Sequence, residues 1–179
     1  MRADLVRALR RGGIDPRGLN AIHRILLTTD GTVTDMLEAY FQEPMQVVPI
    51  AQDLLDSPAP VAELDLAAGQ PILHREILLR GGMSGRTVLH ADSIVVPDRL
   101  SARLREGLLE RQRPIGELLL ADRLETYREI LHCARREAGP LARHFHMYET
   151  APFLTRTYVI SVGRQGIMRI TETFPEQGM

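Results

Sequence analysis

The strongest constraint on this fold comes from two segments in which apolar and polar residues alternate, because a period of two residues is typical of β-strands. In residues 71–79, Arg75 falls within a stripe of leucine and isoleucine on one face. In residues 168–174, Glu172 falls in the same way among methionine, isoleucine and phenylalanine. A buried charge is costly unless it is paired or holds a ligand. The pattern therefore predicts a polar site inside a largely apolar cavity.

The remaining periodicity separates a helical front from a strand-rich middle and end. After Pro44 the apolar period changes from about four residues to two. We expect helices over residues 14–29, 32–41 and 98–112, strands over residues 45–55, 71–80, 87–96, 125–136, 143–148, 153–162 and 167–174, hairpin connectors at residues 81–86 and 163–166, and a tight turn at residues 113–116. About six antiparallel strands with helices mostly at the front predict an α+β fold.

Size and charge narrow the possible functions. The 179 residues suit one domain, residues 1–179, in which residues 1–18 form an N-terminal extension or helix. A formal net charge of −1 gives no electrostatic basis for binding nucleic acid or an anionic membrane. All 22 basic residues are arginine, so guanidinium is the strong cation available to hold an anion.

Cysteine content and the termini indicate a cytoplasmic protein. Cys133 is the one cysteine, which excludes a disulfide within the chain and a zinc site built on cysteines, and we expect it in the core. The N-terminus lacks the apolar segment of a signal peptide, and no apolar run approaches the length of a membrane span.

Arg75 and Glu172 are the main candidates for chemistry. Arg75 is suited to hold a carboxylate through two hydrogen bonds, and Glu172 to bind a hydroxyl or move a proton. Alternatively, the two residues form a structural ion pair with each other. Arg156 shares a predicted strand face with Leu154 and Tyr158, so it is either the buried partner of Glu172 or a second anion-binding residue. The alternation leaves these alternatives open.

Two further motifs carry weaker signals. Residues 29–34 open a helix whose backbone N–H groups are suited to face an anion, or whose first turn is simply capped by Asp30 or Thr32. His144 and His146 would share a strand face, but no third ligand accompanies them, and we expect no metal site.

Five segments, in this order, resemble those of the chorismate lyase (chorismate–pyruvate lyase) family. They are residues 24–40 (RILLTTDGTVT followed by MLEAY), 74–79 (HREILL), 91–97 (ADSIVVP), 113–119 (RPIGELL) and 170–175 (ITETFP). The resemblance covers roughly residues 19–175, and it is closer to the branch known from actinobacteria and archaea than to the enterobacterial enzyme.

The resemblance implies a single antiparallel sheet flanked by helices, with helical flaps over a buried ligand, in a monomeric protein. It also implies cofactor-free conversion of chorismate to 4-hydroxybenzoate and pyruvate. In this sequence, Arg75 matches the arginine that binds the ring carboxylate, and Glu172 the glutamate near the ring hydroxyl. Val33 and Ile115 match positions whose backbone contacts the ligand, and Ala91 a small residue that lines the pocket.

Two points remain open after the resemblance. Arg156 is our own candidate for the enolpyruvyl carboxylate. The alternatives to a chorismate lyase are a relative recruited to specialised biosynthesis, acting on chorismate or another carboxylated ring, and a non-catalytic ligand-binding domain of the same fold. Such domains serve bacterial transcription regulators that carry an N-terminal DNA-binding domain, and the short segment before the matched region here favours the enzyme.

Overall fold

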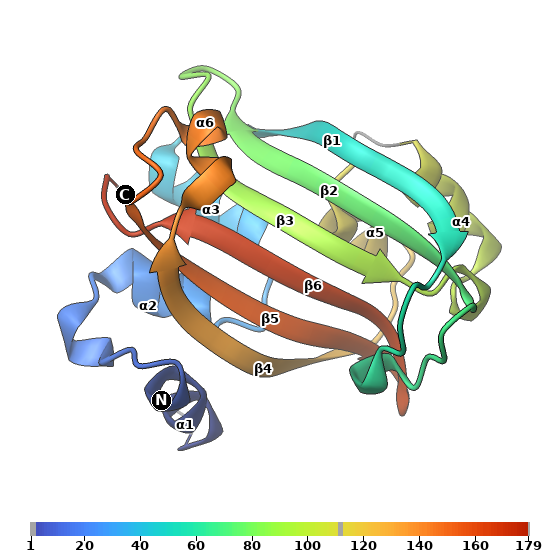
Figure 1. Ribbon diagram of the computed structural model, residues 1–179. Helices are drawn as coiled ribbons and strands as arrows, with labels where there is room; N and C mark the ends of the chain where they lie inside the picture. The colour runs from blue at the N-terminus through green and yellow to red at the C-terminus, as the bar shows by residue number, and fades with distance from the viewer. Residues whose placement is uncertain (1–2, 111–112, 179) are drawn as a thin grey trace.

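One antiparallel sheet organises the part of the chain that the computed structural model describes, residues 3–110 and 113–178 (Figure 1). Within these residues the sheet has six strands in the order β1-β2-β3-β6-β5-β4. Their bounds are β1 Met45–Asp56, β2 Pro71–Gly81, β3 Thr87–Val95, β4 Thr126–Glu137, β5 Pro152–Val162 and β6 Gln165–Pro175. The predicted α+β architecture with a single antiparallel sheet is confirmed.

The sheet consists of two three-stranded meanders joined side by side. Strands β1, β2 and β3 form one meander, strands β4, β5 and β6 form the other, and β3 pairs with β6 where they meet. The register at this junction places Ala91 opposite Glu172, and Arg156 lies opposite Glu172 on its other side. Side chains at directly opposite positions share a face of the sheet, so these three residues form a row.

Helices cover the face of the sheet to which this row belongs. Their bounds are α1 Ala3–Arg11, α2 Ala21–Thr28, α3 Val33–Phe41, α4 Ala102–Leu109, α5 Ile115–Ala121 and α6 Ala142–Phe145, with short 3-10 turns at Pro16–Gly18, Ala62–Leu64, Pro97–Arg99 and Gly139–Leu141. In Figure 1, α2, α3, α4 and α5 lie behind the sheet and α6 lies in front. No helix among the described residues combines the length and apolar character needed to span a membrane.

The main apolar core lies between the sheet and these helices. Leu27 of α2, Leu37 of α3 and Phe174 of β6 are fully buried in it. Helix α2 begins where the Asn20 side chain accepts a hydrogen bond from the backbone N–H of His23, a typical N-cap arrangement. Cys133 is buried as predicted, and burial raises the pKa of its thiol to about 11.

Two local predictions were wrong. Residues 143–148 do not form a strand, because they belong to the short helix α6 and the turn that ends it at His146, which has a φ of 55°. Residues 113–116 are not a free turn, because α5 begins at Ile115, directly after Pro114. Pro114 fixes its own φ near the helical value and is therefore compatible with a helix start.

The predicted helix boundaries were too wide. The segment 14–29 is divided by the 3-10 turn Pro16–Gly18, and α2 begins only at Ala21. The segment 98–112 shortens to α4, Ala102–Leu109, because Ser101 accepts a hydrogen bond from the N–H of Leu104 and fixes the start of the helix. Residues 111–112 of that prediction lie outside the described residues.

Candidate functional site

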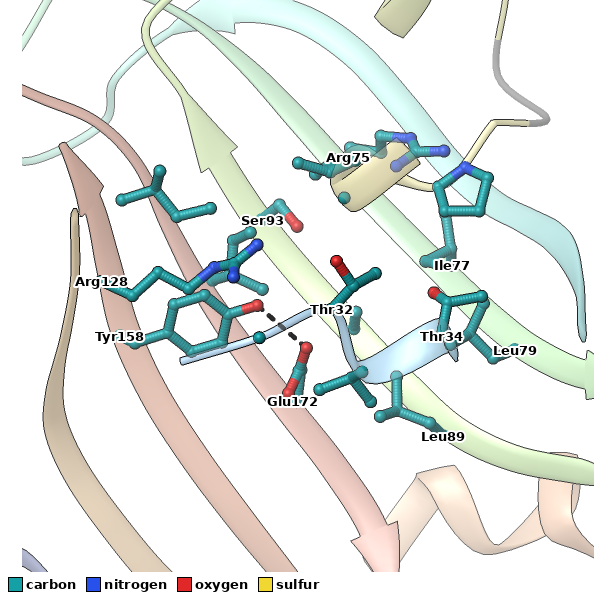
Figure 2. Close-up of a pocket in the computed structure, with 18 residues that line it drawn as sticks. Thr32, Thr34, Arg75, Ile77, Leu79, Leu89, Ser93, Arg128, Tyr158 and Glu172 are labelled. Atoms are coloured by element: carbon teal, nitrogen blue, oxygen red, sulfur yellow. Dashed lines mark hydrogen bonds between the residues drawn. The ribbon is translucent and has the colours of Figure 1, made fainter. Parts of the chain in front are cut away.

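A cavity lies between the helix-covered face of the sheet and the starts of α3 and α5 (Figure 2). Its walls come from five strands, β2 to β6, and from two flap segments, residues 31–34 before and in α3 and residues 114–116 before and in α5. About 540 Å³ is free of protein atoms, including space that opens to solvent. The site is thus built by both meanders and closed by both flap segments.

The two flap segments touch each other above the cavity. A side-chain carbon placed on Gly116 would lie 2.6 Å from Cγ2 of Thr32, a distance that real Cβ atoms do not tolerate. Glycine at this position therefore allows α5 to approach α3 closely. Thr32 is the N-cap residue of α3, one of the two alternatives that the sequence offered, although its side chain makes no capping hydrogen bond.

Arg75 lies at one end of the cavity, with its side chain almost completely buried at 1% exposure. It points from β2, and its Nη2 donates a hydrogen bond of 2.8 Å to the carbonyl oxygen of Arg113, next to the α5 flap segment. Burial lowers the pKa of this guanidinium to about 10. It remains charged at neutral pH, although a low-dielectric setting penalises that charge, and an anionic ligand would offset the penalty.

Glu172 lies in another part of the same cavity and is held by two side chains of β5. Arg156 Nε donates to Glu172 Oε2 at 2.7 Å. The Tyr158 hydroxyl donates to Oε1 at 2.9 Å (Figure 2). Burial and the Glu172 carboxylate both raise the pKa of Tyr158, which stays a neutral hydrogen-bond donor. The carboxylate is therefore fixed in position by one charged and one neutral donor.

Arg156 completes this arrangement from below the cavity surface. Its Nη1 donates to the carbonyl oxygen of Thr29 at 2.8 Å, and its guanidinium lies 4.9 Å from the ring centre of Tyr158. Burial acts to lower the pKa of Arg156, but several neighbouring groups, first among them the Glu172 carboxylate, together outweigh burial, and the net pKa is raised. The ion pair left open by the sequence thus forms between Arg156 and Glu172.

Five of the six predicted site residues line this one cavity: Val33, Arg75, Ala91, Ile115 and Glu172. Arg156 is not among the lining residues, and it occupies the other position foreseen for it, as the partner of Glu172. Arg75 and Glu172 are on strands separated only by β3, which corresponds to about 10 Å between backbones. The prediction that both face one cavity is confirmed, whereas their roles remain predictions.

The lining residues that were not predicted include Arg128 of β4 and Tyr158 of β5. Tyr158 had a signal, because it alternates in phase with Arg156. Arg128 had almost none, since β4 is an edge strand of mostly half-exposed residues and a bulge between Ile130 and His132 interrupts its period. The sequence pattern of such a strand therefore does not distinguish an arginine that faces the cavity from one that faces solvent.

The donor groups suit an organic anion better than a metal ion. Among the described residues, no group of three or more His, Cys, Asp and Glu side chains is placed to hold a metal. His144 lies in α6 and His146 follows it, so the strand face they were expected to share does not exist. The cavity instead offers guanidinium at Arg75 and a fixed carboxylate at Glu172, separated by apolar strand residues.

Known proteins and a family model resemble this chain over most of its length. A family model described as "Chorismate pyruvate-lyase Rv2949c-like" matches residues 27–178. A chorismate pyruvate-lyase of Mycobacterium leprae is 39% identical over 113 residues, covering 63% of this chain and 54% of that protein. One from Mycobacterium tuberculosis is 29% identical over 163 residues, covering 88% of this chain and 81% of that protein. The chain thus aligns with about half the length of the first relative.

Solved structures with the same fold include PhnF and the ligand-binding domain of a regulator. PhnF from Mycobacterium smegmatis superposes with a TM-score of 0.67 at 15% identity, covering 84% of this chain and 66% of that one. The ligand-binding domain of a GntR-family regulator from Bordetella bronchiseptica gives 0.58 at 15% identity, covering 74% and 85%. At this identity the likeness shows the fold alone. The family model, by contrast, spans both flap segments and every strand of the sheet, and the chain belongs to the Rv2949c-like chorismate pyruvate-lyase family.

Proposed function

We propose that this protein is a chorismate lyase that converts chorismate to 4-hydroxybenzoate and pyruvate without a cofactor. The observation that carries the proposal is the placement of Arg75 and Glu172 in one flap-covered cavity of a chain that belongs to this family. Chorismate is a carboxylated ring with a hydroxyl on the carbon opposite the carboxylate. It suits a cavity that has the Arg75 guanidinium at one end and the Glu172 carboxylate in another part.

In the proposed complex, Arg75 binds the ring carboxylate and Glu172 accepts a hydrogen bond from the ring hydroxyl. A guanidinium forms paired, charge-assisted hydrogen bonds with a carboxylate. Val33 and Ile115, at the two flap segments, contact the ring through backbone atoms, and Ala91 leaves space above β3. Closure of the flap segments would exclude water and strengthen both polar contacts.

The reaction is an elimination that makes the ring aromatic. The C4–H bond breaks and its electron pair enters the ring, while the C3–O bond breaks and its electron pair leaves on the enolpyruvate oxygen. The proton ends on the methylene carbon of enolpyruvate, which gives pyruvate. Glu172, fixed by Arg156 and Tyr158, orients the hydroxyl or transfers the C4 proton. Holding the ring in a reactive conformation supplies a further part of the acceleration.

The direct test is to mix the purified protein with chorismate and to quantify pyruvate and 4-hydroxybenzoate together by chromatography. We expect equal amounts of both. Pyruvate with a different aromatic acid would instead identify a relative recruited to another pathway. Tight binding of chorismate with neither product would identify a ligand-binding domain, the role named for several structures of this fold.

The role of Glu172 is tested by Glu172→Gln, which keeps the shape and removes the charge. We expect turnover to fall at least about tenfold in a protein that still folds, as judged by circular dichroism. The matched control is Glu137→Gln, because Glu137 is exposed on β4 and outside the cavity. Turnover at the unmodified rate in Glu172→Gln would refute the proposed role.

A further inference from the structure

Arg128 is the second arginine that lines the cavity, and no role has been assigned to it above. It lies on β4 opposite Ile160 of β5, which also lines the cavity. Figure 2 shows its side chain extending from β4 toward the middle of the lining residues, next to Tyr158. A second guanidinium therefore faces the ligand space from the opposite meander to Arg75.

The guanidinium of Arg128 uses only part of its N–H groups within the described residues. Its Nη1 donates to the carbonyl oxygen of Asp30, the residue before the first flap segment. Its Nε is buried and has no hydrogen-bond partner among the described residues. A buried donor without a partner is costly, and a guanidinium carries five N–H groups. The N–H groups other than the buried Nε and the one bonded to Asp30 remain for an acceptor that a ligand supplies.

The position of Arg128 relative to Glu172 indicates which part of the ligand it meets. Figure 2 shows Arg128 next to Tyr158, whose hydroxyl donates to Glu172, and the charge of Arg128 opposes the rise that burial causes in the pKa of Tyr158. With the ring hydroxyl at Glu172, the ring carbon next to it carries the enolpyruvyl ether. The carboxylate of that substituent is the acidic group of chorismate that the proposed complex has so far left without a partner.

We propose that Arg128 binds the enolpyruvyl carboxylate and thereby selects ligands with two carboxylates over ligands with one. This inference rests on the proposed function for the identity of the substituent. Arg128 takes the role for which the sequence suggested Arg156, because Arg156 is occupied by Glu172 below the cavity surface. Its charge also stabilises the negative charge that develops on the departing enolpyruvate oxygen.

The test compares two aromatic ligands that differ by one carboxylate and cannot react. The monocarboxylate is 4-hydroxybenzoate, and the dicarboxylate is 4-hydroxybenzoate carrying a 1-carboxyvinyl ether at C3. Titration calorimetry on the full chain should show that Arg128→Gln weakens the dicarboxylate at least about tenfold, the loss typical of a hydrogen bond to a charged group. Affinity for the monocarboxylate should change less than about threefold, a small part of one such bond.

Three variants make the result specific. Arg128→Lys keeps the charge and should retain most of the preference for the dicarboxylate. Arg75→Gln should weaken both ligands, and Arg103→Gln, an exposed arginine of α4, should weaken neither. The inference is overturned if Arg128→Gln weakens both ligands equally or neither, or if the unmodified protein does not prefer the dicarboxylate.

The binding experiment is independent of turnover. If chorismate gives no pyruvate but Arg128 still selects the dicarboxylate, the proposed function fails and the ligand class stands. If chorismate is converted but Arg128→Gln keeps the full preference for the dicarboxylate, the proposed function stands and the role of Arg128 fails. The two proposals therefore fail separately.

Discussion

Arg75 and Arg156 are both buried to 1% exposure, yet their surroundings differ. Arg156 lies against the Glu172 carboxylate, which raises its pKa against the opposing effect of burial. Arg75 lies on the cavity wall, donates to the backbone carbonyl of Arg113, and has its pKa lowered to about 10 by burial. The first arginine is neutralised within the protein, whereas the second is placed to interact with a ligand.

This difference separates two uses of a buried charge. An ion pair inside the protein gives rigidity, because each charge depends on the other and removal of one leaves the second uncompensated. A guanidinium on a cavity wall instead gains from an anion that arrives from outside. Arg156 should accordingly affect stability first, and Arg75 should affect ligand affinity first.

The largest expected effect is the loss of stability in Arg156→Met. The variant leaves the Glu172 carboxylate buried without its charged partner, and breaking a buried pair in this way costs about 3–5 kcal/mol. Unfolding in urea, followed by circular dichroism, measures the change. Adding Glu172→Gln in the same chain removes the stranded charge and should recover part of the loss. A loss below about 1 kcal/mol, the range of exposed ion pairs, would mean that the pair does not hold the site together.

The next effect concerns Arg75→Met. Affinity for 4-hydroxybenzoate should fall roughly 10- to 100-fold, because charge-assisted hydrogen bonds to the carboxylate are lost. The free energy of unfolding should change by no more than about 1 kcal/mol, since a well-packed apolar side chain replaces a buried charge at little cost. Calorimetry measures the change in affinity and urea unfolding measures the change in stability, both on the same preparation. If stability falls more than affinity, Arg75 is structural and the contrast with Arg156 disappears.

A smaller effect is expected when the flap segments are forced apart. Gly116→Ala places a methyl group against Thr32, and overpacking of this kind costs about 1–3 kcal/mol. The strain falls on the closed state, so release of 4-hydroxybenzoate should be faster and its affinity lower. Adding Thr32→Ser removes the clashing carbon, and stopped-flow release should then return toward the rate of the unmodified protein. Faster release that persists in the double variant would exclude the close approach as its cause.

The smallest effect concerns His23, a third buried basic group. It donates through Nε2 to the carbonyl oxygen of Pro175 at 3.1 Å, and burial lowers its pKa below the ordinary value of 6.5. The unfolded chain therefore binds a proton more readily than the folded protein does, and stability falls as the pH drops below about 6.5. His23→Gln should flatten this part of the pH profile of urea unfolding. The control His146→Asn, at an exposed position, should leave the profile unchanged.

The sequence predicted the fold class, and it predicted that Arg75 and Glu172 face one cavity, because alternation along a strand records which face is buried. It left the partner of Glu172 open, since pairing depends on the register that sets Arg156 opposite Glu172. Arg128 was not predicted, because both faces of an edge strand carry polar residues and the sequence then does not show which face is buried. The strand expected at residues 143–148 failed because Phe145 packs on Phe153 from a helical turn.

The junction between β3 and β6 has a consequence for how the protein acquires its activity. Every other strand pair joins neighbours in the chain, whereas this pair brings together segments from its middle and its end. Contacts between such distant segments form late in folding, because the entropy of closing a long loop must be overcome first. A chain that emerges slowly during synthesis therefore has no complete ligand site until its last strand, with Glu172, has docked.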